Sequence, residues 1–193
     1  LLPPKARAVR QRLSDFCWEQ LPVMSGDEII VKGPHRLPHT AAYGQTYRGL
    51  PHGSCLCASA AGLYEGQFVL GVAHGRGRLV DAHGTVLEGH WRLREPHGQC
   101  TQTAPDGAHF QGQFRDGKYH GFGVKRYPDG DRYEGQWVEG KKEGMGVYYT
   151  LAGRVFTGEW KNDFQHGTGI LKDINGVERR GSWRNGVHHK WLD

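Results

Sequence analysis

The glycines of this chain recur at a fixed interval, which constrains the fold more than any other sequence feature. All of the 30 glycines except Gly26 and Gly33 fall on one repeat, whose copies are spaced by 22 residues once and by 23 five times. Self-similarity of this length marks a repeat architecture in which each unit contacts only its neighbours. We therefore expect one repeat array over residues 42–193, with a degenerate first copy and a truncated last copy, preceded by an extension over residues 1–41. The seven copies begin at Ala42, Tyr64, Leu87, Phe110, Tyr133, Phe156 and Arg179.

Each copy is typical of a β-hairpin. In the stretch 133–137, Tyr133 and Trp137 flank Gly135, and all three share one face if the segment is extended. The polar, glycine-rich stretch 138–144 then indicates a hairpin connection, and the stretch 145–149 is rich in β-forming residues. A second turn follows at an Asp-Gly or Asn-Gly pair, which predicts a type I′ turn. These pairs are Asp106-Gly107, Asp129-Gly130 and Asn175-Gly176.

The hairpins together predict an all-β fold, a single-layer twisted antiparallel meander. Seven copies of two strands would make a ribbon on the order of 65 Å long, at about 4.8 Å per strand. Glycine weakens strands, and we expect cross-strand aromatic pairs, worth about 0.2–1 kcal/mol each, to offset that loss. A helical array is excluded because each interior glycine costs a helix about 1 kcal/mol.

The extension differs in composition from the repeats. Pro3-Pro4 could open a helix over about residues 4–21, with Val9, Leu13 and Phe16 on one side as candidate docking residues. This helix would either cover the end of its own sheet or dock onto a partner. Residues 34–43 indicate a linker or an extended arm. The absence of an initial Met, with the basic acid-free stretch 5–13, is consistent with a fragment or with a removed import leader.

Metal and acid-base chemistry are not expected, although the chain has 12 histidines and 4 cysteines. Six histidines occupy the same repeat position as Glu143, which predicts a turn-stabilising role. Copies of that position lie two strands, about 10 Å, apart, too far to share a zinc ion. Cys55 and Cys100 stand where other copies have glycine, so we interpret them as small buried residues. We expect no catalytic residues, no cofactor and no metal. The six histidines are His52, His74, His97, His120, His166 and His189.

The repeat resembles a known family. The pattern Tyr-x-Gly-x-Trp-x-x-Gly-x-x-His-Gly-x-Gly, present with Phe68 for Trp over residues 64–77 and again over 110–123, resembles the MORN (membrane occupation and recognition nexus) repeat, and the resemblance covers about residues 42–190. Thr46 replaces the Trp of the first copy, and Arg94 replaces a glycine of the third. The resemblance implies a non-catalytic adaptor of ciliary or cytoskeletal assemblies, or one at membrane junctions.

Two functions follow as hypotheses. The first is a structural subunit of a multi-subunit complex that binds a segment of another protein along its aromatic face, because large rings anchor interfaces. The second is a peripheral module for anionic lipid, suggested by the family name, the formal net charge of +5 and basic turn residues such as Lys141, Lys142 and Lys161. We expect no nucleic-acid partner and no transmembrane segment, and a ciliary, cytoskeletal or mitochondrial setting. The candidate partner-binding residues are Tyr64, Phe68, Trp91, Phe110, Phe114, Tyr133, Trp137, Phe156 and Trp160.

Overall fold

The computed structural model describes residues 30–37 and 40–192. Over these residues the chain forms one antiparallel sheet of 15 strands, in which strands pair only with their neighbours in sequence. The expected single-layer meander is therefore confirmed, and the described ranges contain no helix. The strands are β1 Ile30–Leu37, β2 Thr40–Tyr47, β3 Leu50–Ser59, β4 Gly62–Val69, β5 Val72–Asp81, β6 Val86–Arg92, β7 Glu95–Thr103, β8 His109–Arg115, β9 Lys118–Arg126, β10 Arg132–Val138, β11 Lys141–Tyr149, β12 Val155–Lys161, β13 Phe164–Lys172, β14 Glu178–Arg184 and β15 Val187–Trp191.

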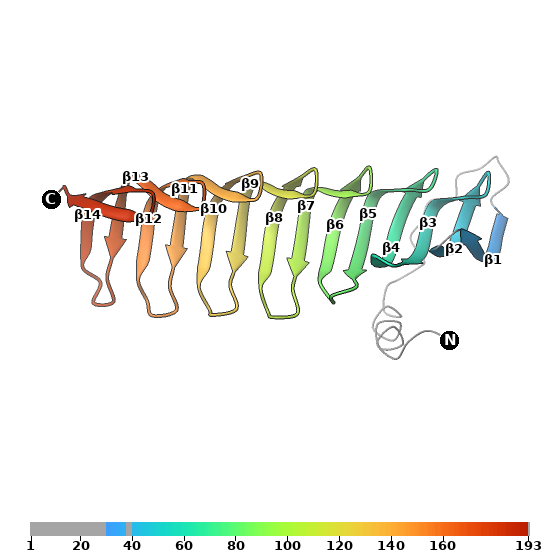
Figure 1. Cartoon of the computed structure of the whole chain (residues 1–193), viewed down its shortest axis with the longest axis horizontal. Coiled ribbons are helices and arrows are strands. Elements are labelled where there is room, and N and C mark those ends of the chain that lie inside the picture. Colours follow the sequence, from blue (N-terminus) through green and yellow to red (C-terminus); the bar gives the residue numbers. More distant parts are fainter. Residues whose placement is uncertain (1–29, 38–39, 193) are drawn as a thin grey trace.

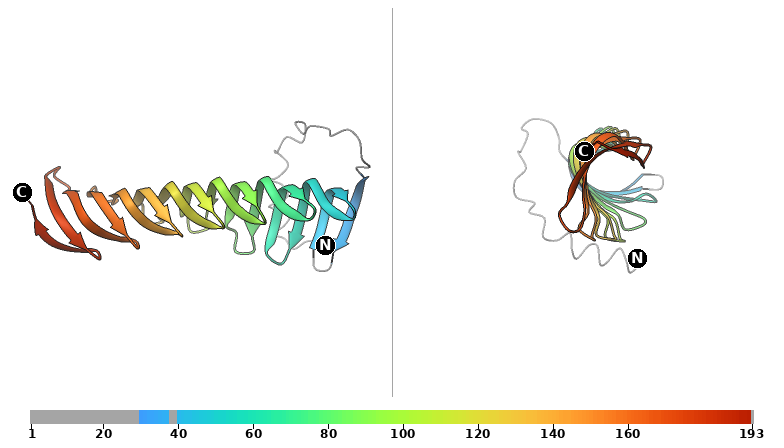
Figure 2. Two further views of the ribbon diagram at one scale, coloured as in Figure 1. Left: turned by 90° about the horizontal axis from the view of Figure 1, so that it is seen from above. Right: turned by 90° about the vertical axis from the view of Figure 1, so that its left-hand side faces the viewer.

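The strands follow one another along a long axis in chain order, from β1 to β15 (Figure 1). Seen along that axis, they curl around one side of the sheet and leave the cross-section open (Figure 2). We call the inner side of this curl the concave face and the outer side the convex face. The helix expected over residues 4–21, with Val9, Leu13 and Phe16, lies outside the described residues.

The sheet begins earlier than the sequence repeat. The array was expected from residue 42, after a linker or arm, but β1 pairs with β2 from Ile30↔Thr46 to Leu37↔Thr40. The register shifts between Lys32 and His35, around Pro34, which has no N–H for the ladder. Main-chain pairing does not require the glycine and aromatic pattern, and this explains why the pattern did not reveal the extra strand.

Each repeat contains two turns of different kinds. The turn between β10 and β11 has positive φ at both central residues, Glu139 (50°) and Gly140 (84°), as a type I′ turn requires. At the Asp129-Gly130 turn only Gly130 has positive φ (91°), and its N–H donates to the Tyr127 carbonyl at 3.0 Å. This is a type I turn followed by a left-handed glycine, so the type I′ prediction there was wrong. Pro128 is the first central residue of the turn that forms, and its fixed φ near −65° suits that position of a type I turn.

A bulge in each repeat bends the strands. In the pairing of β10 with β11, the register shifts between Gly135 and Trp137. On β11, Gly144 has φ of 67°, and the Gln136 amide occupies the space that a Cβ at Gly144 would need. The equivalent Gln67 accepts a hydrogen bond from the Arg76 N–H at 3.0 Å. Bulges bend strands and increase twist, so one bulge per repeat accounts for the curl.

Candidate functional site

The aromatic residues expected to bind a partner form the core of the protein. All nine are buried, and the most accessible of them, Tyr64, is 8% exposed. In a sheet one layer thick, only the side enclosed by the curl can bury a ring this fully, so these residues lie on the concave face. Two rows of side chains supply them. The starting row is Ala42, Tyr64, Leu87, Phe110, Tyr133, Phe156 and Arg179; the second aromatic row is Phe68, Trp91, Phe114, Trp137, Trp160 and Trp183.

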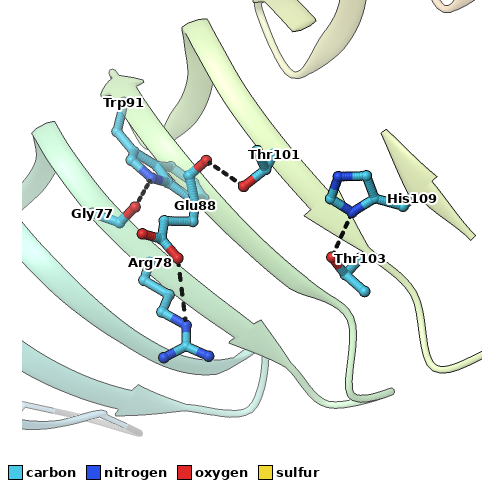
Figure 3. A network of polar contacts seen from close by, with 7 residues as sticks. All are labelled: Gly77, Arg78, Glu88, Trp91, Thr101, Thr103 and His109. Atoms are coloured by element: carbon cyan, nitrogen blue, oxygen red, sulfur yellow. Dashed lines mark hydrogen bonds and ion pairs between the residues drawn. The ribbon is translucent and has the colours of Figure 1, made fainter. Parts of the chain in front are cut away.

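The rings form an edge-to-face ladder on either side of Leu87. Tyr133 contacts Trp137 of its own repeat at 5.2 Å between centroids and Trp160 of the next repeat at 5.1 Å, with interplanar angles of 89° and 79°. Such geometry is worth about 0.5–1.5 kcal/mol per pair beyond area burial. The indole N–H groups reach back one repeat, from Trp137 to the Gly123 carbonyl at 3.2 Å and from Trp91 to the Gly77 carbonyl at 2.9 Å (Figure 3). On either side of Leu87, the ladder therefore links neighbouring repeats.

Each ring of the starting row lies over a glycine of the next strand in its repeat. A Cβ at Gly146 would overlap the Tyr133 ring, and a Cβ at Gly123 would overlap the Phe110 ring. The late glycine row, as we call these positions, contains cysteine where the starting row lacks a ring: Cys55 goes with Ala42, and Cys100 with Leu87. Both thiols are buried and free, as expected from the sequence. The row consists of Cys55, Gly77, Cys100, Gly123, Gly146 and Gly169.

The cysteine thiols also replace a hydroxyl. The Tyr133 hydroxyl donates to the Gln136 carbonyl at 3.2 Å, at the bulge. In the third repeat the Cys100 thiol donates to the equivalent carbonyl of His90 at 3.3 Å. Burial raises the pKa of the Cys100 thiol, against the lowering effect of this backbone contact. The thiol therefore stays protonated near neutral pH and acts as a donor.

Three tyrosines remain partly exposed on the concave face. Tyr119 pairs in register with Phe114, and its ring stacks on Phe110 at 3.6 Å between centroids. Tyr148 pairs in register with buried Tyr133, and the ring centroids of Tyr127 and Tyr148 are 6.0 Å apart. All three have intermediate exposure. The tyrosine cluster, as we call Tyr119, Tyr127 and Tyr148, is thus a part of the aromatic face that another molecule can reach.

Two lysines lie among these rings. The Lys142 ammonium is 4.6 Å from the Trp160 ring centroid and 4.9 Å from that of Tyr148. The Lys125 ammonium is 5.4 Å from the Tyr119 centroid and 5.2 Å from that of Tyr127. Burial lowers the pKa of both lysines, and Asp163 partly offsets the effect. Among the described residues, neither ammonium makes a hydrogen bond or an ion pair.

The nearby acidic residues are engaged elsewhere. Asp131 accepts a hydrogen bond from the Tyr148 hydroxyl at 2.8 Å and another from the Leu151 N–H at 2.9 Å. Asp163 accepts one from the Lys142 main-chain N–H at 2.9 Å. Burial and these carboxylates raise the pKa of Tyr127 to about 12. The phenols of the tyrosine cluster are therefore neutral, and the two lysines beside the cluster are cationic.

The N-terminal half of the concave face has no lysine at the positions of Lys125 and Lys142. The residues equivalent to Tyr119 and Lys142 there are Ala73 and Pro96, and those equivalent to Lys125 are Leu79 and Gln102. Leu87 interrupts the ring ladder and packs against both of the core clusters that the buried residues form. The two halves of the face therefore differ in chemistry.

The convex face carries exposed apolar side chains that sequence reasoning missed. Phe122 is 59% exposed and Met145 56% exposed, at a repeat position that is polar in other copies. Earlier copies have polar contacts on this face, including Arg78 with Glu88 at 4.0 Å (Figure 3). Phe122 and Met145 could have been found in the sequence, because they depart from the polar residues that the other copies have at this position.

The shared histidine position stabilises a turn in two copies. His52 Nδ1 accepts a hydrogen bond from the Leu70 N–H at 3.5 Å, and Glu143 accepts one from the Asn162 N–H at 2.9 Å. In both cases the donor is the first left-handed residue of the next type I′ turn. In the described part of the chain, no group of three or more His, Cys, Asp or Glu residues could hold a metal ion.

The sequence comparisons agree with this geometry. The model of the MORN repeat matches residues 64–86, 88–109, 110–132, 133–150 and 156–177, more than half of the chain. The chain belongs to the MORN repeat family. No curated protein matches its sequence. Among solved structures, the MORN array is similar to the TCP domain of SAS-4 (dCPAP) of Drosophila melanogaster, in complex with a proline-rich motif of Ana2 (dSTIL), at 11% identity and a TM-score of 0.49, over 86% of this chain and 97% of that one.

No helix among the described residues of the MORN array is long and apolar enough to cross a membrane.

Proposed function

We propose that this protein is a non-enzymatic adaptor that binds a segment of another protein along the concave face of its MORN repeat sheet. The observation that carries the proposal is the tyrosine cluster, since partly exposed rings backed by a rigid core resemble the anchors of protein interfaces. The nine buried aromatics expected as contacts would act from beneath, by holding Tyr119, Tyr127 and Tyr148 in position. Binding rather than catalysis is favoured because the phenols are held in fixed structural contacts.

A crosslinking experiment tests which face is used. The photoreactive residue p-benzoylphenylalanine would replace Gln165, which pairs in register with Trp160 and so lies on the concave face. The matched control replaces Gln111, which alternates with buried Phe110 and Gly112 and so lies on the convex face. Irradiation in cells that express the protein should give a protein adduct from position 165 and none from position 111. Adducts from position 111 alone would contradict the proposal.

Anionic lipid has weaker support as the ligand. Lys142 lies among aromatic rings, and Lys141 contacts Asn162 at 3.4 Å on an exposed turn. Lys118, the first residue of β9, forms an ion pair with Glu139 at 2.7 Å. A membrane surface attracts basic residues that face it together, and these residues do not share one surface. For the cellular setting, a ciliary or cytoskeletal assembly or a mitochondrial complex remains our expectation.

A further inference from the structure

We propose that the C-terminal half of the concave face recognises an acidic segment of the partner protein, with a carboxylate placed between Lys125 and Lys142. This inference rests on the adaptor function proposed above and deepens it. The bound segment of the partner would be acidic, and it would run in one direction along the sheet. The argument has three steps: the unmet charge of the two lysines, the shape of their surroundings, and the contrast between the two halves of the face.

The first step concerns charge. Both ammonium groups are partly withdrawn from water and lie near aromatic rings, and in the described ranges neither makes a hydrogen bond or an ion pair. Both lysines lie near one ring, with Lys125 5.2 Å and Lys142 5.8 Å from the Tyr127 centroid. Lys125 also disfavours the charge of Lys142, since it is among the causes that lower the Lys142 pKa. A carboxylate between them would supply the missing acceptor and relieve the repulsion.

The second step concerns the acids already present. Asp163 acts on both lysines through space, and Asp106 acts on Lys125. The Asp163 carboxylate is already bound by a main-chain N–H of Lys142, and Asp131 is bound by Tyr148. These groups reduce the positive potential but leave the ammonium donors without an acceptor. Lys125 pairs in register with Tyr133 and Lys142 with Trp137, so both lysines lie on the concave face. The sheet curls around this face (Figure 2), so a chain segment can enter it and a flat membrane surface cannot.

The third step concerns direction. None of the equivalent side chains in the second and third repeats is charged, with Leu79 and Gln102 in place of Lys125 and Ala73 and Pro96 in place of Lys142. A bound segment should therefore place its apolar part over β3–β6 and its acidic part over β8–β13. The two ends of the face therefore differ in charge, and this difference would fix the direction in which the partner segment runs.

Selection from a random-peptide library displayed on phage tests the inference with the whole chain as bait. Selected peptides should be enriched in Asp and Glu next to apolar residues. They should also crosslink from position 165 of the photoreactive variant. Replacing their acidic residues by Gln or Asn should weaken binding to the unaltered chain about tenfold, as expected for a lost hydrogen bond to a charged group. This arm needs no substitution in the sheet.

Matched substitutions locate the contact. Lys125→Met and Lys142→Met keep the alkyl stem, and each should weaken binding of the selected peptides about tenfold. Lys161→Met, at the exposed end of β12, should change binding by less than about twofold. Fluorescence anisotropy gives the Kd values, and urea unfolding checks that each variant is folded. If either Met variant fails to fold, an Arg substitution at the same position takes its place. The Arg variant should still bind the acidic peptide more tightly than the same peptide with Gln or Asn in place of its acidic residues.

The outcomes separate the two proposals. Peptides that crosslink from position 165 without an acidic bias would overturn this inference and leave the adaptor function standing. Failure of all peptides to crosslink from position 165 would count against both. Binding to phosphatidylserine-containing vesicles that Lys125→Met and Lys142→Met abolish, with no peptide selected, would assign the site to lipid and overturn the inference.

Discussion

At the scale of single residues, the side chain in the late glycine row follows the size of its partner in the starting row. Tyr133 and Phe110 require Gly146 and Gly123, because their rings occupy the space of a Cβ. The smaller Leu87 leaves room for Cys100, whose thiol takes over the hydrogen bond to the bulge carbonyl. These pairings were visible in the sequence as an exchange of residue types. Its physical reason was not visible, because it depends on how the ring folds back over the sheet.

This exchange predicts a measurable coupling. Gly146→Cys should be destabilising because the thiol meets the Tyr133 ring, and Tyr133→Leu should be destabilising because it leaves a cavity and an unpaired Gln136 carbonyl. The double variant reproduces the Leu87 and Cys100 pair and should recover about 1–3 kcal/mol relative to the sum of the single changes. Urea unfolding measures all four proteins. Strict additivity would show that the two positions do not share this space.

The second aromatic row allows a smaller test. Trp137→Phe removes the indole donor to the Gly123 carbonyl and should lower the free energy of unfolding by about 1–3 kcal/mol, since that buried acceptor loses its partner. Phe114 already occupies this position in the neighbouring repeat, so the ring itself fits. The control is Phe114→Leu, which removes a ring without removing a donor. An unchanged urea midpoint for Trp137→Phe would contradict the role given to the indole bond.

At the scale of elements, strands were easier to predict than turns. Alternation and β-propensity identified the hairpin of residues 133–149, and the structure forms it as β10 and β11. The turn at Asp129-Gly130 was assigned from those two residues alone, whereas the turn that forms is centred one residue earlier, on Pro128 and Asp129. Strand β1 was missed because backbone pairing leaves no repeated side-chain pattern in the sequence.

The type I′ turn of the third repeat predicts a stabilising substitution. Leu93 and Arg94 have φ of 52° and 73°, and Arg94 stands where most copies have glycine. Arg94→Gly should raise the free energy of unfolding by about 0.5–1 kcal/mol, because relief of the left-handed conformation exceeds the added entropy of the unfolded chain. The reverse change, Gly140→Arg, should lower it by a similar amount. Equal thermal midpoints for all three proteins would refute this account of the turn.

At the scale of the whole molecule, the sequence predicted a single-layer sheet but not its curl. The curl depends on a bulge in each repeat, and the bulge depends on where the Gln136 side chain packs against Gly144. Without the curl, the nine aromatics were expected to face a partner, whereas they face one another. The accessible tyrosine and lysine cluster could not be predicted because exposure on this face is set by the curvature.

The nearest-neighbour pairing predicts local unfolding. Phe156→Ala should lower hydrogen-exchange protection in β10–β14 and leave β3–β6 unchanged, because repeats stabilise only their neighbours and Leu87 interrupts the ring ladder between the two core clusters. Tyr64→Ala should do the opposite. Mass spectrometry of deuterated peptides gives both profiles. A uniform loss of protection along the chain in either variant would show that the array unfolds as one unit.

The strictly sequential order of β1 to β15 has a consequence for how such a chain can change length. Because no strand crosses over another, duplication or deletion of one unit leaves every remaining register intact. Each unit would alter the reach of the protein by about 10 Å, the width of two strands. The protein can thus gain or lose length in equal steps of one repeat, while the strands at its two ends stay the same.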